Sequence, residues 1–173
     1  MLAAISLILV SLPPSTSFLP PPLVPSFPSS TTASSTFLLF LPPSPPPPSS
    51  VTSKIDSLYP PSSVEHRNSL SRTDGYWPYV RTNKPPPLEY TYGEFPLSSF
   101  DALLTLALSV SGVSEASEVD FLDLGSGAGR LVLAAKLLKG FRSCEGVEML
   151  PTLHRHAEEV LGGEGGVRLF EGR

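Results

Sequence analysis

Hydrophobic and polar positions follow two different periods over the second half of the chain. Three segments repeat apolar residues at helical spacing and are each closed by a glycine: 98–112, 128–140 and 150–163. Three short apolar runs have the character of buried parallel strands: 119–125, 143–149 and 166–172. This alternation predicts an α/β domain with a partial doubly wound, Rossmann-like sheet of about three parallel strands, in the spatial order third, second, first.

The first half of the chain shows no sustained period and has a different composition. Twenty of the 21 prolines lie at or before Pro96, whereas eleven of the 13 glycines lie after it. A Pro/Ser-rich stretch lacks backbone donors and cannot build a packed core. We therefore expect residues 18–84 to be disordered or extended and the globular part to cover residues 85–173.

The first residues, MLAAISLILVSL, are too few to span a bilayer and fit the hydrophobic region of a signal peptide. Small residues at 15 and 17 favour a signal peptide over 1–17, with a helix over 2–12. The stretch STSFLP also resembles the Phe-centred junction of plastid precursors in algae with secondary plastids. These features predict a plastid or secretory route and no membrane span in the mature chain. The alternative is a disordered tail with a chance hydrophobic start.

The net charge of −4 argues against a polyanion-binding protein as a whole. The linker before the predicted globular part carries several bases, among them Arg67, Arg72, Arg81 and Lys84. They belong to a solvated linker or form a weak basic arm. Cys144 is the only cysteine, which excludes an internal disulfide, and it falls in a predicted buried strand. His154 and His156 point to different faces of a predicted helix, are expected to be solvated and make no metal pair, so no metal site is predicted.

The stretch FLDLGSGAGR, residues 121–130, forms the turn from the first predicted strand into the next helix. Doubly wound sheets bind nucleotides at such turns, because glycines allow positive φ and close approach while the helix N-terminus presents amide donors. The spacing is G-x-G-x-G, not the G-x-G-x-x-G of dinucleotide-binding proteins, and Asp123 precedes the first glycine by two residues. A carboxylate there repels a diphosphate and suits a cationic amino group.

A second acid, Glu148, ends the second predicted strand. A carboxylate in that place can accept two hydrogen bonds from neighbouring ribose hydroxyls. An amino-acid end near the glycines and a ribose at the second strand together describe S-adenosyl-L-methionine. A plain Rossmann-like domain with another ligand is the alternative that these residues leave open.

Residues 89–172 resemble class I S-adenosyl-L-methionine-dependent methyltransferases, and within them the DOT1 group of histone-lysine methyltransferases. The resemblance rests on YGE at 92–94, FLDLGSGAGR at 121–130 and GVE at 146–148, in the same order and with similar gaps. It implies transfer of a methyl group to a histone or another lysine-bearing protein, with nucleic acid involved only through chromatin. It also implies cofactor contact by ten residues: Tyr92, Gly93, Glu94, Phe95, Asp123, Gly125, Ser126, Gly127, Gly129 and Glu148.

The chain departs from the DOT1 group after the third predicted strand, where Arg173 is its last residue. The group continues with an acid and an aromatic residue that hold the adenine and with an Asn-rich catalytic motif. We therefore name no catalytic residue and expect the N-terminal portion of the domain, truncated after the third strand, with its first strand an exposed edge and no activity alone. A Rossmann-like module that binds a cofactor or partner without catalysis is the alternative. The chromatin substrate of the group makes the nucleus the alternative location.

Overall fold

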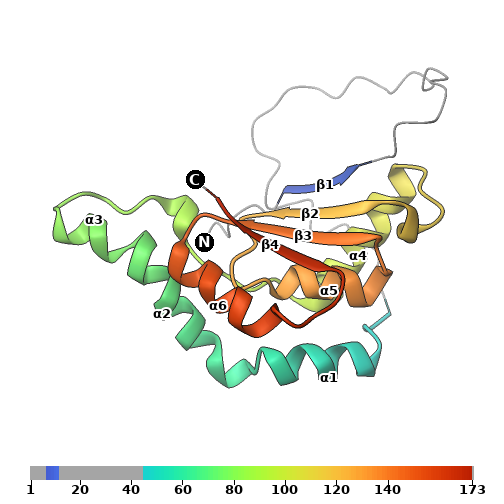
Figure 1. Ribbon diagram of the computed structural model, residues 1–173, viewed down its shortest axis with the longest axis horizontal. Helices are drawn as coiled ribbons and strands as arrows, with labels where there is room; N and C mark the ends of the chain where they lie inside the picture. The colour runs from blue at the N-terminus through green and yellow to red at the C-terminus, as the bar shows by residue number, and fades with distance from the viewer. Residues whose placement is uncertain (1–6, 12–44, 173) are drawn as a thin grey trace, which may run out of the picture.

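The computed structural model describes residues 7–11 and 45–172, which form one four-stranded sheet with helices packed against it (Figure 1). The strands are, in spatial order, β1 (Leu7–Ser11), β2 (Asp120–Leu124), β3 (Ser143–Glu148) and β4 (Val167–Glu171). β2, β3 and β4 are parallel, with Phe121 opposite Cys144 and Cys144 opposite Val167. The predicted α/β class, the three parallel strands and their order are confirmed.

β1 corrects two expectations about the ends of the sheet. Residues 7–11 form a strand instead of part of a helix over 2–12, and they pair antiparallel with β2, with Leu9 opposite Leu122. β2 is therefore not an exposed edge of the described sheet. The run LILVS is rich in residues that favour strands, and an unpaired β2 offers it a row of free backbone N–H and C=O groups. Residues 1–6 and 12–17 of the predicted signal peptide lie outside the described residues.

Three helices match the predicted helical segments to within a few residues: α4 (Leu97–Val110), α5 (Arg130–Lys139) and α6 (Pro151–Leu161). α5 begins later than predicted because Gly127 and Gly129 still have left-handed backbone, with φ of 57° and 79°. Gly140 ends the same helix at φ 67°, as expected for a glycine stop.

Residues 45–81 correct the prediction that the chain is disordered up to residue 84. They form α1 (Ser49–Leu58), a 3-10 turn (Pro61–Ser63), α2 (Val64–Gly75) and α3 (Trp77–Arg81), and a second 3-10 turn follows at Leu88–Tyr90. α1 belongs to the core because Val51, Ile55 and Tyr59 are spaced by four residues and all three are buried. These three apolar residues lie among prolines and serines, so the sequence pattern did not indicate a helix. Tertiary packing rather than helix propensity stabilises α1. Residues 18–44 of the predicted Pro/Ser-rich segment lie outside the described residues.

The helices are layered on the sheet (Figure 1). α5 and α6 pack on the strands, α1 packs on α5, and α2 packs on α6. The hydrophobic core includes Phe121, Val132, Leu133 and Cys144. Cys144 is fully buried, as predicted, and burial raises the pKa of its thiol to about 12.

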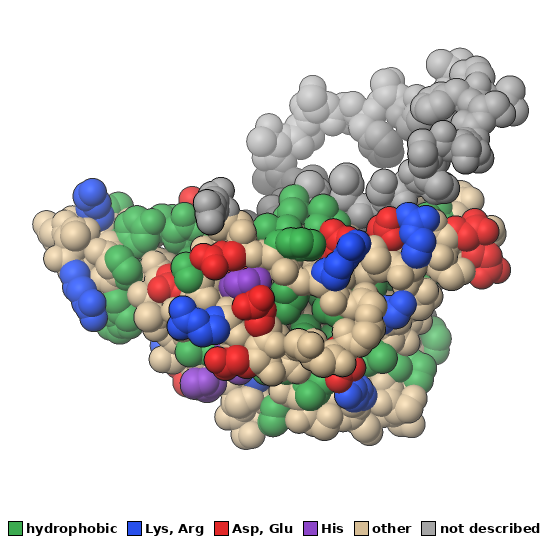
Figure 2. Space-filling view, viewed as in Figure 1, with side chains coloured by type: hydrophobic (Ala, Val, Ile, Leu, Met, Phe, Trp, Pro, Cys, Tyr) green, Lys and Arg blue, Asp and Glu red, His purple; other side chains and the backbone are tan. Residues whose placement is uncertain are grey.

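The surface carries charges of both signs. Lys, Arg, Asp and Glu side chains are interspersed on the face shown in Figure 2. Interspersed charges create no strong field of one sign over that face. Within residues 7–11 and 45–172, no helix is long and apolar enough to cross a membrane.

At the start of β2, Asp120 accepts hydrogen bonds from Arg142 Nε at 2.9 Å and from Ser143 Oγ at 2.7 Å. The hydrogen bond from Arg142, and then that from Ser143, lowers the pKa of the Asp120 carboxyl to about 2. A folded-state pKa below the unfolded value adds stability that is present above about pH 4 and is lost as the pH falls to about 2. Because the side chain is 34% exposed, solvent screening limits this contribution to about 1 kcal/mol or less.

We therefore expect Asp120→Asn to be less stable than the wild type at neutral pH, with a difference that shrinks between about pH 4 and pH 2. Melting temperature measured against pH by circular dichroism checks this. Asp56→Asn, at an exposed position of α1, is the control and should follow the wild-type curve. A difference for Asp120→Asn that stays constant down to the acid limit would contradict the assignment.

Candidate functional site

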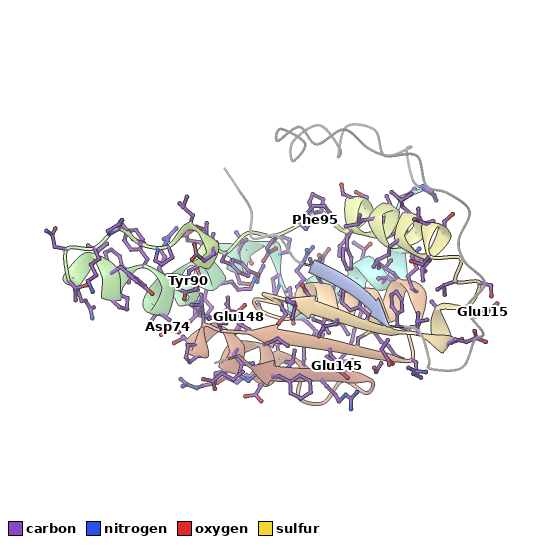
Figure 3. The ribbon with its side chains drawn as sticks, turned by 90° about the horizontal axis from the view of Figure 1, so that it is seen from above. Asp74, Tyr90, Phe95, Glu115, Glu145 and Glu148 are labelled. Carbon is purple, nitrogen blue, oxygen red and sulfur yellow. The ribbon has the colours of Figure 1, made fainter. Side chains whose placement is uncertain are left out.

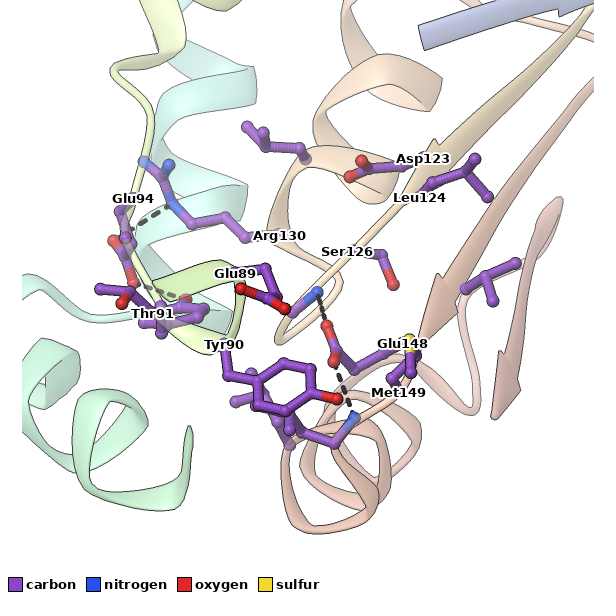
Figure 4. Close-up of a pocket in the computed structure, with 18 of the residues that line it drawn as sticks. Glu89, Tyr90, Thr91, Glu94, Asp123, Leu124, Ser126, Arg130, Glu148 and Met149 are labelled. Carbon is purple, nitrogen blue, oxygen red and sulfur yellow. Dashed lines mark hydrogen bonds and ion pairs between the residues drawn. The ribbon is translucent and has the colours of Figure 1, made fainter. Parts of the chain in front are cut away.

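A cavity of about 360 Å³ lies at the carboxyl ends of β2 and β3, and residues 89–95 form its opposite wall (Figure 4). The carboxyl ends of parallel strands meet at one edge of a sheet, so the turns after β2 and β3 line the cavity together. Seen from above, Tyr90 and Glu148 lie at this edge and Glu115 lies at the far end of the molecule (Figure 3). The cavity therefore occupies the place at which ligands bind in open α/β sheets.

Nine of the ten predicted cofactor contacts line this cavity: Tyr92, Gly93, Glu94, Phe95, Asp123, Gly125, Ser126, Gly127 and Glu148. They come from three separate segments, and the fold brings them together. Ten further residues line the cavity besides these predicted contacts: Glu89, Tyr90, Thr91, Leu124, Arg130, Leu131, Val147, Met149, Leu150 and Leu153. Most of these are sequence neighbours of predicted contacts, so the motifs marked the right segments but not every side chain.

Gly129, the tenth predicted contact, does not line the cavity. It precedes α5, and a Cβ built on it would lie 2.7 Å from Leu161 Cδ1 and 3.5 Å from the Ala157 Cβ. The missing side chain thus allows α5 and α6 to pack closely. The third glycine of the G-x-G-x-G pattern serves helix packing, while the first two face the cavity.

The turn after β2 needs glycine for two different reasons. Gly125 has φ 80° and open space where a Cβ would be, so only its backbone conformation requires glycine. Gly127 has φ 57°, and a Cβ on it would lie 2.8 Å from Cε2 of Tyr92. The Tyr92 ring therefore rests directly on the backbone at Gly127 and connects the 92–95 loop to the turn.

The turn after β2 also packs directly against β3. Ser126 lies over Gly146, where a Cβ would come within 2.7 Å of Ser126 Oγ and 2.8 Å of Val132 Cγ2. This contact explains the glycine of the GVE motif. Within the described part of the chain, Ser126 Oγ is buried and has no hydrogen-bond partner. Asp123, the second-last residue of β2, is 1% exposed and lines the cavity.

Glu148 joins the turn to the end of β3. Its Oε2 accepts a hydrogen bond from the Gly127 N–H at 2.7 Å, and its Oε1 accepts one from the Leu150 N–H at 2.8 Å (Figure 4). Beside it, Asp74 of α2 accepts a hydrogen bond from the Thr152 N–H at 2.7 Å, in the first turn of α6. Each oxygen of a carboxylate has two lone pairs, so Glu148 keeps one acceptor position on each oxygen for a ligand in the cavity.

Glu94 is more deeply engaged with the protein than its place in the YGE motif suggested. Its Oε1 accepts hydrogen bonds from Arg67 Nε at 2.6 Å and from the Tyr92 hydroxyl at 3.0 Å, and its Oε2 lies 3.8 Å from Arg130 Nε. Arg67, expected in a solvated linker, is 1% exposed. Burial, followed by the charge of Glu94, raises the pKa of Tyr92, so this hydroxyl stays protonated and donates. The sequence carried no signal for the Arg67 contact, because 27 residues separate it from Glu94.

The lining of the cavity is strongly acidic. Among the residues that the structure describes, it contains the carboxylates of Glu89, Glu94, Asp123 and Glu148 and a single cation, Arg130. The remaining side chains are aliphatic or aromatic, apart from the hydroxyls of a few residues. A cavity of this kind favours a ligand that carries positive charge and disfavours a diphosphate.

The residue that follows α1 is hydrogen-bonded to the turn between β2 and α5. The buried Tyr59, which follows α1, donates a hydrogen bond from its hydroxyl to the Ala128 carbonyl at 2.8 Å. Tyr59→Phe removes this donor and is expected to lower the free energy of unfolding by about 1 kcal/mol. Urea unfolding measures the effect, and Tyr76→Phe, at a position 42% exposed, is the matched control. Equal stability of the two variants would show that the hydroxyl does not hold the turn.

The two histidines of α6 pack against neighbouring side chains and belong to no group of metal ligands among the described residues. His154 is buried on the inner face of α6 and lies 3.6 Å from Glu158, while the His156 ring packs edge-on against His66 of α2. Both were expected to be solvated; His154 is instead buried, and His156 is partly covered by α2, which packs against α6. Among the described residues there is no group of three or more His, Cys, Asp or Glu side chains that could hold a metal ion.

Comparison with known proteins adds no relative. No protein-family model matches the chain, and no curated protein and no solved structure matches it significantly. The site is therefore interpreted from its own geometry and from the motifs at 92–94, 121–130 and 146–148.

Proposed function

We propose that the protein binds S-adenosyl-L-methionine in the cavity at the ends of β2 and β3 and acts as a methyltransferase on lysine side chains of a protein, in the manner of the DOT1 group. The observation that carries the proposal is the acidic cavity itself. Asp123 and Glu148 lie on either side of the glycine turn at the ends of neighbouring strands. This pairing of acids suits a cofactor with a cationic amino group and a ribose, and it does not suit a dinucleotide.

The residues present fit this cofactor. Glu148 retains acceptor positions for two ribose hydroxyls, and Asp123 offers a carboxylate to an ammonium group. The backbone of Gly125 and Gly127 lines the cavity, and Gly125 leaves open space where a side chain would stand. When bound, the cofactor supplies a methyl group on a sulfonium, an electrophile that needs alignment more than acid–base assistance.

The chain's own residues would then orient the reactants and exclude water. The aromatic side chains of Tyr90, Tyr92 and Phe95 line the wall opposite the strands, and aromatic faces attract alkylammonium groups. A lysine must lose its proton before it can attack, and a cavity closed to water favours the neutral amine. We assign no general base to any residue of the chain.

Labelled cofactor tests the proposal directly. After ultraviolet irradiation of the full chain with methyl-labelled S-adenosyl-L-methionine, we expect label in peptides that contain residues 121–130 or 146–150. Transfer of label to histones, and its loss after the lysines are acylated, would support the lysine substrate. Binding without transfer to any protein would favour the alternative, a binding module without catalysis. Failure to label either peptide would contradict the proposal.

The N-terminal residues carry a separate proposal about location. We propose a plastid or secretory route, based on the apolar start, the small residues before Phe18 and the STSFLP stretch. The full chain with a fluorescent reporter at its C-terminus is expected to accumulate in the plastid or the secretory pathway. A nuclear signal would instead support a chromatin substrate, and a diffuse cytosolic signal would contradict the targeting proposal.

A further inference from the structure

The wall of the cavity is anchored to a helix that supplies none of its lining. Arg67 of α2 is fully buried, and its Nε and Nη2 lie 2.6 Å and 2.5 Å from Oε1 of Glu94. Glu94 belongs to the 92–95 loop, which faces the glycine turn across the cavity. The contact is thus an ion pair between a buried cation of α2 and a carboxylate of the cavity wall that is 20% exposed.

The guanidinium group is itself held on several sides. Arg67 Nη1 donates hydrogen bonds to Ser63 Oγ at 2.6 Å and to the Pro60 carbonyl at 3.4 Å. Its central carbon lies 5.7 Å from the centre of the Tyr59 ring, within the range of a cation–π contact. Pro60, Ser63 and Tyr59 therefore hold the guanidinium group in place independently of Glu94.

From Glu94 the contacts continue to the floor of the cavity. The Tyr92 hydroxyl donates to the same carboxylate oxygen as Arg67, and the Tyr92 ring lies against Gly127. On the other side, Arg130 of α5 donates to the Phe95 carbonyl at 3.0 Å. Hydrogen bonds therefore hold the loop at Tyr92 and at Phe95, and Glu94 between them contacts Arg67, Tyr92 and Arg130.

We infer that Arg67 is a positioning residue that holds the 92–95 loop closed over the cavity through Glu94. With respect to the ligand, this inference rests on the proposed function. Glu94 accordingly acts as the anchor of the loop, because its Oε1 accepts hydrogen bonds from both Arg67 and Tyr92. Without Arg67, the Glu94 carboxylate keeps only the more distant Arg130, at 3.8 Å, as a cationic partner, so the loop should leave its place when Arg67 is removed.

A matched pair of arginines on one helix tests this inference. Arg72 also lies on α2 and pairs with Glu65 at 3.0 Å, but the two side chains are 48% and 71% exposed, and neither lines the cavity or pairs with Glu94. In the full chain, we expect R67Q to speed amide hydrogen exchange at residues 92–95 while the amides of β3 remain protected. Its affinity for S-adenosyl-L-methionine should fall about tenfold or more, as for other positioning partners of a binding group. R72Q should leave both measurements at the wild-type values.

Two further variants separate positioning from folding. R67K keeps the positive charge but lacks the planar guanidinium group with its several N–H donors. Amide exchange at residues 92–95 should therefore be slower in R67K than in R67Q but faster than in the wild type. The double variant R67Q/E94Q leaves no unpaired buried charge, so its melting temperature should recover toward the wild-type value while exchange at 92–95 stays fast. Exchange at 92–95 that is unchanged in R67Q and in the double variant would overturn the inference. If the wild type does not bind the cofactor, the proposed function fails, and loop exchange still decides the role of Arg67.

Discussion

Replacing Glu148 by alanine is expected to weaken S-adenosyl-L-methionine binding by about 1 to 3 kcal/mol, the range for hydrogen bonds to a charged group. This loss corresponds to a rise in Kd of roughly 5- to 150-fold. The reason is that Glu148 lines the cavity at the end of β3 and keeps acceptor capacity for a ligand, while it also accepts hydrogen bonds from the Gly127 and Leu150 amides. The substitution therefore removes a ligand contact and also loosens the glycine turn. Isothermal titration calorimetry measures the change in Kd.

The control for this variant lies on the same strand. Glu145 points to the other face of β3 and pairs with Arg168, and Glu145→Ala should bind the cofactor like the wild type. Melting temperatures of both variants separate a binding loss from a folding loss, because the Glu148 variant should still unfold cooperatively. Affinity of Glu148→Ala equal to that of Glu145→Ala would remove the ribose assignment.

Gly127→Ala is expected to destabilise the protein by about 2 to 4 kcal/mol, because it adds backbone strain at positive φ to an overpacked contact. The added Cβ would lie 2.8 Å from the Tyr92 ring. Since Tyr92 donates to Glu94, displacement of the ring also disturbs the 92–95 loop, and cofactor affinity should fall together with stability. Chemical denaturation and calorimetry measure the two effects.

Gly125→Ala supplies the comparison for the same turn. Its φ is equally left-handed, at 80°, but nothing lies within 4 Å of an added Cβ. The backbone strain alone is expected to cost about 1 to 2 kcal/mol. The difference between the two variants therefore isolates the contact with Tyr92. Equal destabilisation of the two would show that the Tyr92 ring does not rest on the turn.

The sequence predicted those elements whose hydrophobic spacing and glycine stops specify the same strand or helix that the tertiary structure contains. β2, β3 and β4 are short apolar runs between helices that glycines close, and the alternation of the two periods fixes a parallel sheet. The cavity was predictable for the same reason, since the carboxyl ends of adjacent parallel strands bring Asp123 and Glu148 to one edge. Gly129 lies outside the cavity lining and against α6, and spacing alone does not tell which glycine faces a cavity and which faces a helix.

The part that the sequence did not predict depends on contacts between distant segments. The stripe formed by Val51, Ile55 and Tyr59 is narrow and lies among prolines and serines, so only burial against the core reveals it as a helix. Arg67 looked like a solvated base because its partner, Glu94, is brought to it by the fold. β1 pairs with a strand more than a hundred residues away, and no local pattern specifies that register.

The most direct test of the account is calorimetric titration of the full chain with S-adenosyl-L-methionine, repeated in the presence of excess nicotinamide adenine dinucleotide. The acidic lining of the cavity and the acceptor positions of Glu148 predict saturable binding at one site, with an affinity that the dinucleotide does not change. Absence of binding, or competition by the dinucleotide at comparable concentration, would contradict the assignment of this cavity to a sulfonium cofactor.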